Sequence, residues 1–290
     1  MQNAINKAKA LIEAMEYIRQ FKGRIVVIKL GGSILDDEVL QRELLRDVVF
    51  MHTVGIMPLL VHGGGKHILR AMETSGIEPE WVHGRRYTDR ITLKIVEHTL
   101  INEVNKPLCD ILAEMGCDSM GLHSMSSCAV TGKPLELKED GRKLDLGYVG
   151  EVEGVNSRLL EKLCRAGTIP VLAPLGIDIA GQKLNINADS VAGVVAAAVG
   201  AEKFVLLSDT HGIRQDINDP ESRISSISED EIKSLIDKGV IAGGMLPKID
   251  SCLKAIDGGV GKAHIIDGRL QHSLLLEIYT EEGIGTQIIK

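Results

Sequence analysis

The sequence predicts an α/β protein in which helices cover both faces of a mostly parallel sheet. Short runs rich in leucine and β-branched residues alternate along the chain with segments of helical length and period. Two successive strands run into glycine turns, IKLGGS at 28–33 and VHGGGKH at 61–67. The 290 residues, 44% of them hydrophobic, suffice for one large domain with two lobes.

Composition excludes several classes of function. A formal net charge of -7 argues against a nucleic-acid or anionic membrane surface, because both need a basic face. Aromatic residues make up only 3%, so there is little material for base stacking, and no run approaches the ~20 uncharged apolar residues of a membrane span. Five cysteines without a C-x-x-C pair favour reduced thiols. We expect a cytoplasmic protein whose partners are small molecules or other protein chains.

A helix over residues 3–21 comes first. Apolar residues recur there at steps of three and four and form one stripe: Ile5, Ala8, Ile12, Met15, Ile18 and Phe21. The stripe must be buried on its own domain or on another subunit, and the periodicity leaves both open.

The strands RIVVIKL and IMPLLV follow, each leading through its glycine turn into a helix. Between Val130 and Val155 the alternation and the Asp140-Gly141 pair predict an antiparallel hairpin, which could lie over a site as a lid. A further strand, TIPVLAPLGI at 168–177, leads through a turn at Gly181 to KLNINADS.

The last third continues the same alternation. A helix of small residues, VAGVVAAAVGA, precedes the apolar strand KFVLLSD. Ser228 with Glu231 three residues on predicts a capping box for the next helix. The segment GGMLPKIDSCLKAIDGG predicts a glycine turn opening a helix with Lys248 in its first turn, and AHIID predicts a last core strand.

The two glycine turns suggest an anion site. Glycines at the carboxyl end of a strand let backbone N–H groups approach an anion, and the following helix adds its positive dipole. One such turn is weak evidence, but turns after two adjacent strands can hold two anionic groups close together. Walker-type and dinucleotide-binding glycine patterns are missing. The hydrolase motif G-x-S-x-G is also missing, because its nearest match, CDSMG at 117–121, has a cysteine in place of the first glycine.

Three charged residues beside glycine turns point to phosphoryl transfer, which depends on positioning and on neutralising charge at phosphate oxygens. Lys29 precedes the first glycine turn, Lys248 follows Gly243-Gly244, and Asp189 stands at a helix start. Singly, they read as a strand-end lysine, a solvated helix residue and a helix cap. Together they favour a kinase.

Several motifs, in order and at characteristic spacing, resemble the amino-acid-kinase family: IKLGGS, VHGGGKHI, GRRYTD, LNINADSVA, LLSD and GGMLPKI. The resemblance covers residues 4–290 and is greatest to the members that phosphorylate N-acetyl-L-glutamate in arginine biosynthesis. It implies a three-layer αβα sandwich with a kinase domain at 23–290. In this reading 23–184 is the amino-acid-substrate lobe, 185–290 the nucleotide lobe and 1–22 an oligomerisation helix.

The resemblance also implies a reaction, in which ATP with Mg²⁺ phosphorylates the side-chain carboxylate of N-acetyl-L-glutamate to N-acetyl-L-glutamyl 5-phosphate. No general base is needed, because the carboxylate is already ionised at neutral pH. No protein metal ligands are expected, since the metal arrives with ATP. The implied catalytic residues are Lys29, Lys248 and Asp189; Gly31 and Gly32 bind phosphate; and Gly64, Gly65, Arg86, Asn185 and Asn187 bind the substrate.

Arginine-sensitive relatives resemble this chain in the helix before the first strand and in the ending HSLLLEIYTEEGIGT. The resemblance implies feedback inhibition by arginine, with Glu277 on its guanidinium and Gly283 nearby, and a hexamer built as a trimer of dimers. The alternative is that the helix before the first strand serves only in assembly and has no part in arginine inhibition. The segment LHSMSSCAV at 122–130 departs from the family, as does THGI after LLSD.

Two other functions stay open from the motifs. One is an acyl kinase for a protected aminoadipate, because one methylene is worth only about 1 to 3 kcal/mol in a pocket. The other is a non-catalytic arginine-binding regulatory subunit that keeps the fold, against which the joint presence of Lys29, Asp189 and Lys248 argues.

Overall fold

A computed structural model describes residues 1–124, 126, 129–216, 219, 222–279 and 283–290. Its centre is an eight-stranded sheet in the order β14-β16-β15-β13-β1-β2-β10-β5, parallel throughout except for the β15/β16 pair. The strands are β1 (Ile25–Leu30), β2 (Met57–His62), β5 (Ser119–Leu122), β10 (Ile169–Leu172), β13 (Lys203–Ser208), β14 (Ser226–Ser228), β15 (Lys262–Asp267) and β16 (Thr286–Ile289).

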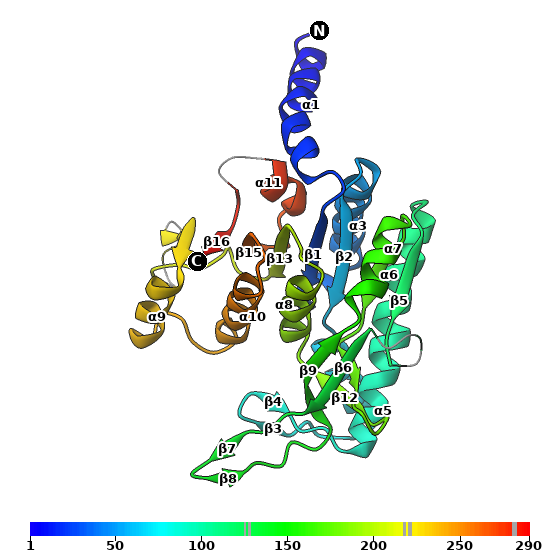
Figure 1. Cartoon of the computed structure of the whole chain (residues 1–290), viewed down its shortest axis with the longest axis vertical. Coiled ribbons are helices and arrows are strands. Elements are labelled where there is room, and N and C mark those ends of the chain that lie inside the picture. Colours follow the sequence, from blue (N-terminus) through cyan, green and yellow to red (C-terminus); the bar gives the residue numbers. More distant parts are fainter. Residues whose placement is uncertain (125, 127–128, 217–218, 220–221, 280–282) are drawn as a thin grey trace.

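Helices cover both faces of this sheet and complete the predicted αβα sandwich (Figure 1). On β1, Val27 packs into the core with α7, α8 and α10, whereas Val26 and Ile28 pack into the core with α3, α6 and α11. The helices are α1 (Gln2–Phe21), α2 (Gly32–Leu35), α3 (Glu38–Thr53), α4 (Gly65–Thr74), α5 (Arg90–His98), the π-helix η1 (Thr99–Asn105), α6 (Lys106–Glu114), α7 (Ser157–Arg165), α8 (Ala188–Ala198), α9 (Glu229–Asp237), α10 (Met245–Asp257) and α11 (Ser273–Tyr279).

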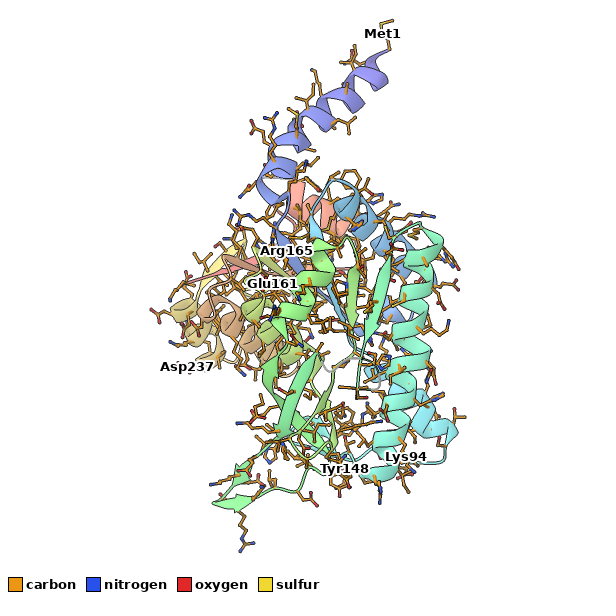
Figure 2. The ribbon with its side chains drawn as sticks, turned by 45° about the vertical axis from the view of Figure 1, so that its right-hand side comes forward. Met1, Lys94, Tyr148, Glu161, Arg165 and Asp237 are labelled. Carbon is orange, nitrogen blue, oxygen red and sulfur yellow. The ribbon has the colours of Figure 1, made fainter. Side chains whose placement is uncertain are left out.

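The first helix, α1, matches the prediction of 3–21 and projects from the body, with Met1 at its far tip (Figures 1 and 2). Its carboxyl end packs on the chain, where Phe21 is buried and Tyr17 meets Tyr279 edge-on. The outer apolar residues are exposed, Ile12 by 64% and Leu11 by 68%. Most of the predicted stripe is therefore exposed to solvent and has no apolar partner among the residues that the structure describes.

A small closed barrel lies at the end of the molecule opposite α1 (Figure 1). Its strands are β6 (Val130–Pro134), β9 (Val149–Val155), β11 (Leu175–Ile177) and β12 (Lys183–Ile186). The predicted hairpin is confirmed as the antiparallel β6/β9 pair, with β7 (Lys138–Glu139) and β8 (Arg142–Lys143) at its tip. Asp140 and Gly141 both have positive φ there, the conformation that this turn requires.

One predicted strand is wrong. TIPVLAPLGI forms two strands in different sheets, β10 in the central sheet and β11 in the barrel. The break falls at Ala173-Pro174, because proline has no N–H with which to continue a ladder. The capping box of Ser228 and Glu231 at the start of α9 is confirmed.

Candidate active site

Both predicted glycine turns open at the same edge of the sheet. Strands β1 and β2 are adjacent and parallel, with Leu30 opposite His62, so the turns that follow them lie side by side. The Gly63 N–H donates to the Leu30 carbonyl at 3.0 Å and ties one turn to the other. Helices α2 and α4 begin directly after the turns and direct their free N–H groups toward this edge.

Close packing explains two of the glycines. A Cβ at Gly31 would lie 2.6 Å from the Leu207 carbonyl oxygen, and one at Gly64 would lie 2.5 Å from Leu100 Cδ2. Any larger residue at Gly31 would push its turn away from β13, because a backbone carbonyl cannot give way. An ideal Cβ at Gly31 would also be 3.9 Å from the Lys29 Nζ, so this turn lies beside the predicted catalytic lysine.

The three predicted catalytic residues come together across three elements. Lys29 near the end of β1 lies 2.8 Å from the Asp189 Oδ1, and Lys248 in the first turn of α10 lies 3.8 Å from its Oδ2. Lys29 and Asp189 are each only 6% exposed. Asp189 is not the helix cap, since the Asn187 side chain accepts the Ser190 N–H at the start of α8. The carboxylate is therefore free to bridge the two ammonium groups.

Asp189 carries a charge at neutral pH. Burial by itself would raise the pKa of its carboxyl, but Lys29 and Lys248 outweigh burial and hold the pKa below its usual value. A buried carboxylate between two lysines stabilises both cations and keeps their separation constant. Both ammonium groups are consequently held beside the glycine turns.

A cavity of about 220 Å³, here called the substrate cavity, lies next to this bridge. Most of the residues predicted for the reaction line it: Lys29, Gly64, Gly65, Arg86, Asn185, Asn187 and Asp189. Lys248, Gly31 and Gly32 do not line it, although Lys248 reaches its edge through Asp189. Trp81 of β3 (Trp81–Val82) also lines the cavity, which the sequence analysis did not predict.

Arg86, on β4 (Arg85–Arg86), is a buried cation whose charge is available to a ligand. Its guanidinium donates to the Gly65 carbonyl at 3.2 Å and lies 4.9 Å from the centre of the Trp81 ring. No carboxylate among the described residues lies within ion-pair distance of it. Burial lowers the pKa of Arg86, yet arginine stays charged at neutral pH. A desolvated guanidinium of this kind favours an anionic ligand.

Asn185 of β12 also lines the cavity and is held in place by a hydrogen bond. Its Nδ2 donates to the Thr88 Oγ1 at 3.1 Å, and the Thr88 hydroxyl donates in turn to the Arg86 carbonyl at 2.9 Å. Thr88 is fully buried and was not predicted. Through this chain of hydrogen bonds the two predicted substrate-binding side chains have fixed relative positions.

The predicted arginine residues line a second cavity, of about 270 Å³, here called the α11 cavity. Glu277 is buried, with its Oε1 3.0 Å from the Lys203 Nζ and 2.5 Å from the His264 Nδ1. Gly283 lies against the same carboxylate, since a Cβ there would be 3.0 Å from the Oε2. Tyr17 of α1 completes the wall.

Sequence reasoning missed Lys203 and His264. Each is a buried polar residue beside the apolar run of its strand, FVLL in β13 and II in β15, and that contrast was the available signal. On the paired strands β13 and β15, Lys203 lies opposite Lys262, two residues before His264, so the Lys203 and His264 side chains lie on the same face of the sheet and both contact Glu277.

The described residues also give findings on metal ligands, membrane-crossing helices and cysteines. The described residues contain no group of three or more His, Cys, Asp or Glu side chains that could hold a metal ion. No described helix combines the length and apolar character needed to cross a membrane. Cys109, Cys117, Cys164 and Cys252 are free thiols. Within the unusual segment 122–130, residues 125 and 127–128 lie outside the described residues.

Known proteins are similar to this chain in sequence. A sequence model of the amino acid kinase family matches residues 24–267. The acetylglutamate kinase of Symbiobacterium thermophilum is 44% identical over 291 residues, covering 100% of this chain and 99% of that protein.

Solved structures agree with the fold. N-acetylglutamate synthase from Neisseria gonorrhoeae, complexed with coenzyme A and N-acetyl-glutamate, superposes with a TM-score of 0.86 at 27% identity. The match covers 98% of this chain and 63% of that one, so this chain spans less than two thirds of the synthase. The same synthase complexed with coenzyme A and L-arginine superposes with a TM-score of 0.82 at 26% identity, covering 98% of this chain and 65% of that one. On its sequence, its sheet and its paired glycine turns, the chain belongs to the amino acid kinase family.

Proposed function

We propose that this chain transfers the γ-phosphoryl group of ATP to the side-chain carboxylate of N-acetyl-L-glutamate, forming N-acetyl-L-glutamyl 5-phosphate in cytoplasmic arginine biosynthesis. The observation that carries the proposal is the Lys29–Asp189–Lys248 bridge beside a cavity that contains an unpaired, buried Arg86. Full-length similarity to an acetylglutamate kinase supports the choice of substrate.

The substrate cavity supplies a partner for each charged end of such a substrate. Arg86 holds the α-carboxylate with its planar fork, and Asn185 faces the same end of the molecule. The side-chain carboxylate then lies at the glycine turns, where the N–H groups of Gly64 and Gly65 meet it. It attacks as the anion, so no side chain needs to remove a proton.

The γ-phosphoryl group lies between the substrate carboxylate and the two lysines. Phosphoryl transfer spreads charge over the phosphate oxygens, and Lys29 and Lys248 neutralise that charge while Asp189 holds both lysines in position. Gly31 and Gly32 offer backbone N–H groups at the start of α2.

A third cavity, of about 650 Å³, lies between the end of β13 and the start of α10 and is our candidate for the nucleotide. Asp209, Gly212, Lys238 and Met245 line it, and Met245 begins the helix that carries Lys248. A nucleotide in this cavity would have its phosphates directed toward Lys29 and Lys248. We propose that Mg²⁺ arrives with ATP and is held mainly by the ATP phosphates. Mg²⁺ usually keeps several of its water ligands and binds substrate phosphates, and it is seldom enclosed by protein ligands alone.

Hydroxylamine trapping of acyl phosphate with Mg-ATP tests the function. We expect a signal with N-acetylglutamate and none with glutamate, because glutamate carries an ammonium group in place of the acetamido group, close to the buried cation Arg86. A larger kcat/KM for N-acetylaminoadipate would instead identify the longer acid as the substrate. No signal with any of the three would overturn the proposal in favour of a non-catalytic subunit.

We further propose that the α11 cavity binds arginine as a feedback inhibitor. The guanidinium lies toward Glu277, while Lys203 attracts the carboxylate and Tyr17 closes the cavity from α1. That a structurally similar synthase was solved with L-arginine supports the ligand class. Deleting residues 1–20 should abolish inhibition with kcat retained; unchanged inhibition would contradict the proposal. Tyr17→Ala, which keeps α1, separates loss of the cavity wall from loss of assembly.

The exposed stripe of α1 supports a homo-oligomer, which we propose to be a hexamer formed as a trimer of dimers. Ile5, Leu11, Ile12 and Met15 are large apolar residues left in solvent within one chain, and a second copy of α1 would bury them. Light scattering of the wild type against Leu11→Glu tests this: the variant should be smaller by a whole-number ratio.

A further inference from the structure

His62 is a buried titratable residue to which the proposed reaction gives no role. It ends β2 and directly precedes the second glycine turn, and none of its surface is exposed. Both ring nitrogens have partners. Nδ1 lies 2.7 Å from the Gly63 carbonyl oxygen, and Nε2 lies 2.9 Å from the Asn105 Nδ2.

The hydrogen-bond partners of Asn105 determine which ring nitrogen of His62 carries the proton. The Asn105 Nδ2 also lies 2.9 Å from the Val171 carbonyl oxygen, which can only accept, so the amide nitrogen must face it. The second hydrogen of that nitrogen faces the His62 Nε2, which therefore accepts. The proton of the neutral ring is left on Nδ1, from which it is donated to Gly63.

The ring is neutral under working conditions. Burial lowers the pKa of His62 to about 4, although the hydrogen bond to Gly63 opposes this shift. A ring that is neutral at pH 7 and accepts at Nε2 has one tautomer only.

Asn105 is itself tightly placed. It ends the π-helix η1, a rare conformation that is frequent at functional sites. A Cβ at Gly121 of β5 would lie 2.1 Å from the Asn105 Oδ1, so the amide packs directly against that glycine. The same π-helix contacts the glycine turn a second time, through Leu100 against Gly64.

The hydrogen bond from His62 to the Gly63 carbonyl oxygen also orients the N–H group of Gly64, which belongs to the same peptide. In a trans peptide the C=O of Gly63 and the N–H of Gly64 point in opposite directions, and the Gly63 N–H is already bound to Leu30. The described residues provide no acceptor for the N–H groups of Gly64 and Gly65, and both glycines line the substrate cavity.

We propose that His62 is a positioning residue for phosphoryl transfer: Asn105 fixes its tautomer, and its Nδ1–H holds the Gly63–Gly64 peptide with the Gly64 N–H toward the reacting group. The inference rests on the proposed function, because it assigns the N–H to the carboxylate and phosphate of that reaction. Such donors must be in place before the charge develops, so their orientation affects kcat more than KM.

A matched pair of variants separates the two ring nitrogens. His62→Asn places an amide N–H where Nδ1 stands, and His62→Gln places an amide where Nε2 stands. We expect His62→Gln to lower kcat about 10- to 100-fold, with a smaller change in KM, since a small misplacement costs on this scale. His62→Asn should keep kcat within about threefold of the wild type.

Acyl hydroxamate formation, expressed per folded molecule from circular dichroism, is the measurement. An unchanged kcat in His62→Gln, or an equal loss in both variants, would overturn the proposal, since a merely structural histidine changes stability without this split. The wild type is the reference: if it forms no acyl phosphate, the proposed function fails, whereas a variant-specific loss addresses His62 alone.

Gly121→Ala supplies a second test if neither His62 variant folds. Its methyl group would displace the Asn105 side chain without touching the substrate cavity, and a side-chain amide can move. We expect kcat to fall about tenfold with thermal stability largely kept. Met120→Ala, at the exposed neighbouring position on β5, is the control and should keep the wild-type kcat. Equal kcat in Gly121→Ala and Met120→Ala would overturn the proposal.

Discussion

The substrate cavity and the α11 cavity are built around the same device, a buried carboxylate between two basic side chains. Asp189 lies between Lys29 and Lys248, and Glu277 lies between Lys203 and His264. The two devices occupy opposite ends of adjacent strands, because Lys29 is near the end of β1 whereas Lys203 begins β13.

They differ in their balance of charge. Lys29, Arg85 and Arg86 line the substrate cavity and Lys248 lies at its edge, whereas Asp189 is the one carboxylate on the described lining, so an anionic ligand would balance the charge. Burial lowers the pKa of His264, which leaves Lys203 and Glu277 as a balanced pair. The buried groups at the proposed reacting site therefore carry an excess of positive charge, whereas the buried groups of the α11 cavity form a balanced pair beside the exposed Lys262.

Removing a cation from the substrate cavity has the largest expected effect. We expect Lys29→Met to lower kcat about 10³-fold, because a donor aimed at developing charge is lost while the apolar stem still fills β1. Acyl hydroxamate rates measure this, with the exposed Lys106→Met as control. A kcat within tenfold of the wild type would show that Lys29 has a structural role and does not act on the transferring group.

The ion pair of Lys203 and Glu277 should make the stability of the folded chain depend on pH in acid. Burial would raise the pKa of Glu277, but the His264 hydrogen bond and Lys203 outweigh it and lower the pKa to about 2, from an ordinary 4.5. A depressed folded pKa gives stability that is complete above pH 4.5 and lost as the pH falls toward 2. The total is about 3 kcal/mol, of which about 2 is lost by pH ~3.

Urea unfolding of the wild type and Glu277→Gln checks this. Glutamine cannot ionise, so the difference in unfolding free energy between the two proteins should narrow by about 2 kcal/mol from pH ~5.5 to pH ~3. A difference that does not change with pH would mean that Glu277 is not ionised in the folded chain.

Arg86→Lys tests whether the unpaired cation binds substrate. We expect KM for N-acetylglutamate to rise about 10- to 100-fold with a smaller change in kcat, because an ammonium cannot make the bidentate contact of a guanidinium. The exposed Arg158→Lys should keep the wild-type KM. If Arg86→Lys lowers kcat alone, the guanidinium acts on the transferring group instead.

The two cavities also differ in how far they could be predicted. The glycine turns follow from local pattern, and turns after two successive parallel strands open at one sheet edge, so the meeting of Gly31 and Gly64 was foreseeable. Lys203 and His264 come from strands about 60 residues apart, and only tertiary packing brings them to Glu277. The π-helix that ends at Asn105 was equally hidden, because no residue type in TLINEVN distinguishes a π-helix from an α-helix. Pro174 was a visible signal for the strand break, although it was read as part of one strand.

Gly283→Ala is the smallest and most specific perturbation of the α11 cavity. Gly283 and Gly76 both have positive φ, so alanine at either should cost about 1 kcal/mol in urea unfolding. Nothing lies within 4 Å of a Cβ at Gly76, whereas one at Gly283 would meet the Glu277 Oε2 at 3.0 Å. Gly283→Ala should therefore weaken arginine inhibition while Gly76→Ala leaves it unchanged. An equal arginine response in the two variants would show that a methyl group beside the Glu277 carboxylate does not affect inhibition. Gly283 would then not belong to the proposed arginine site.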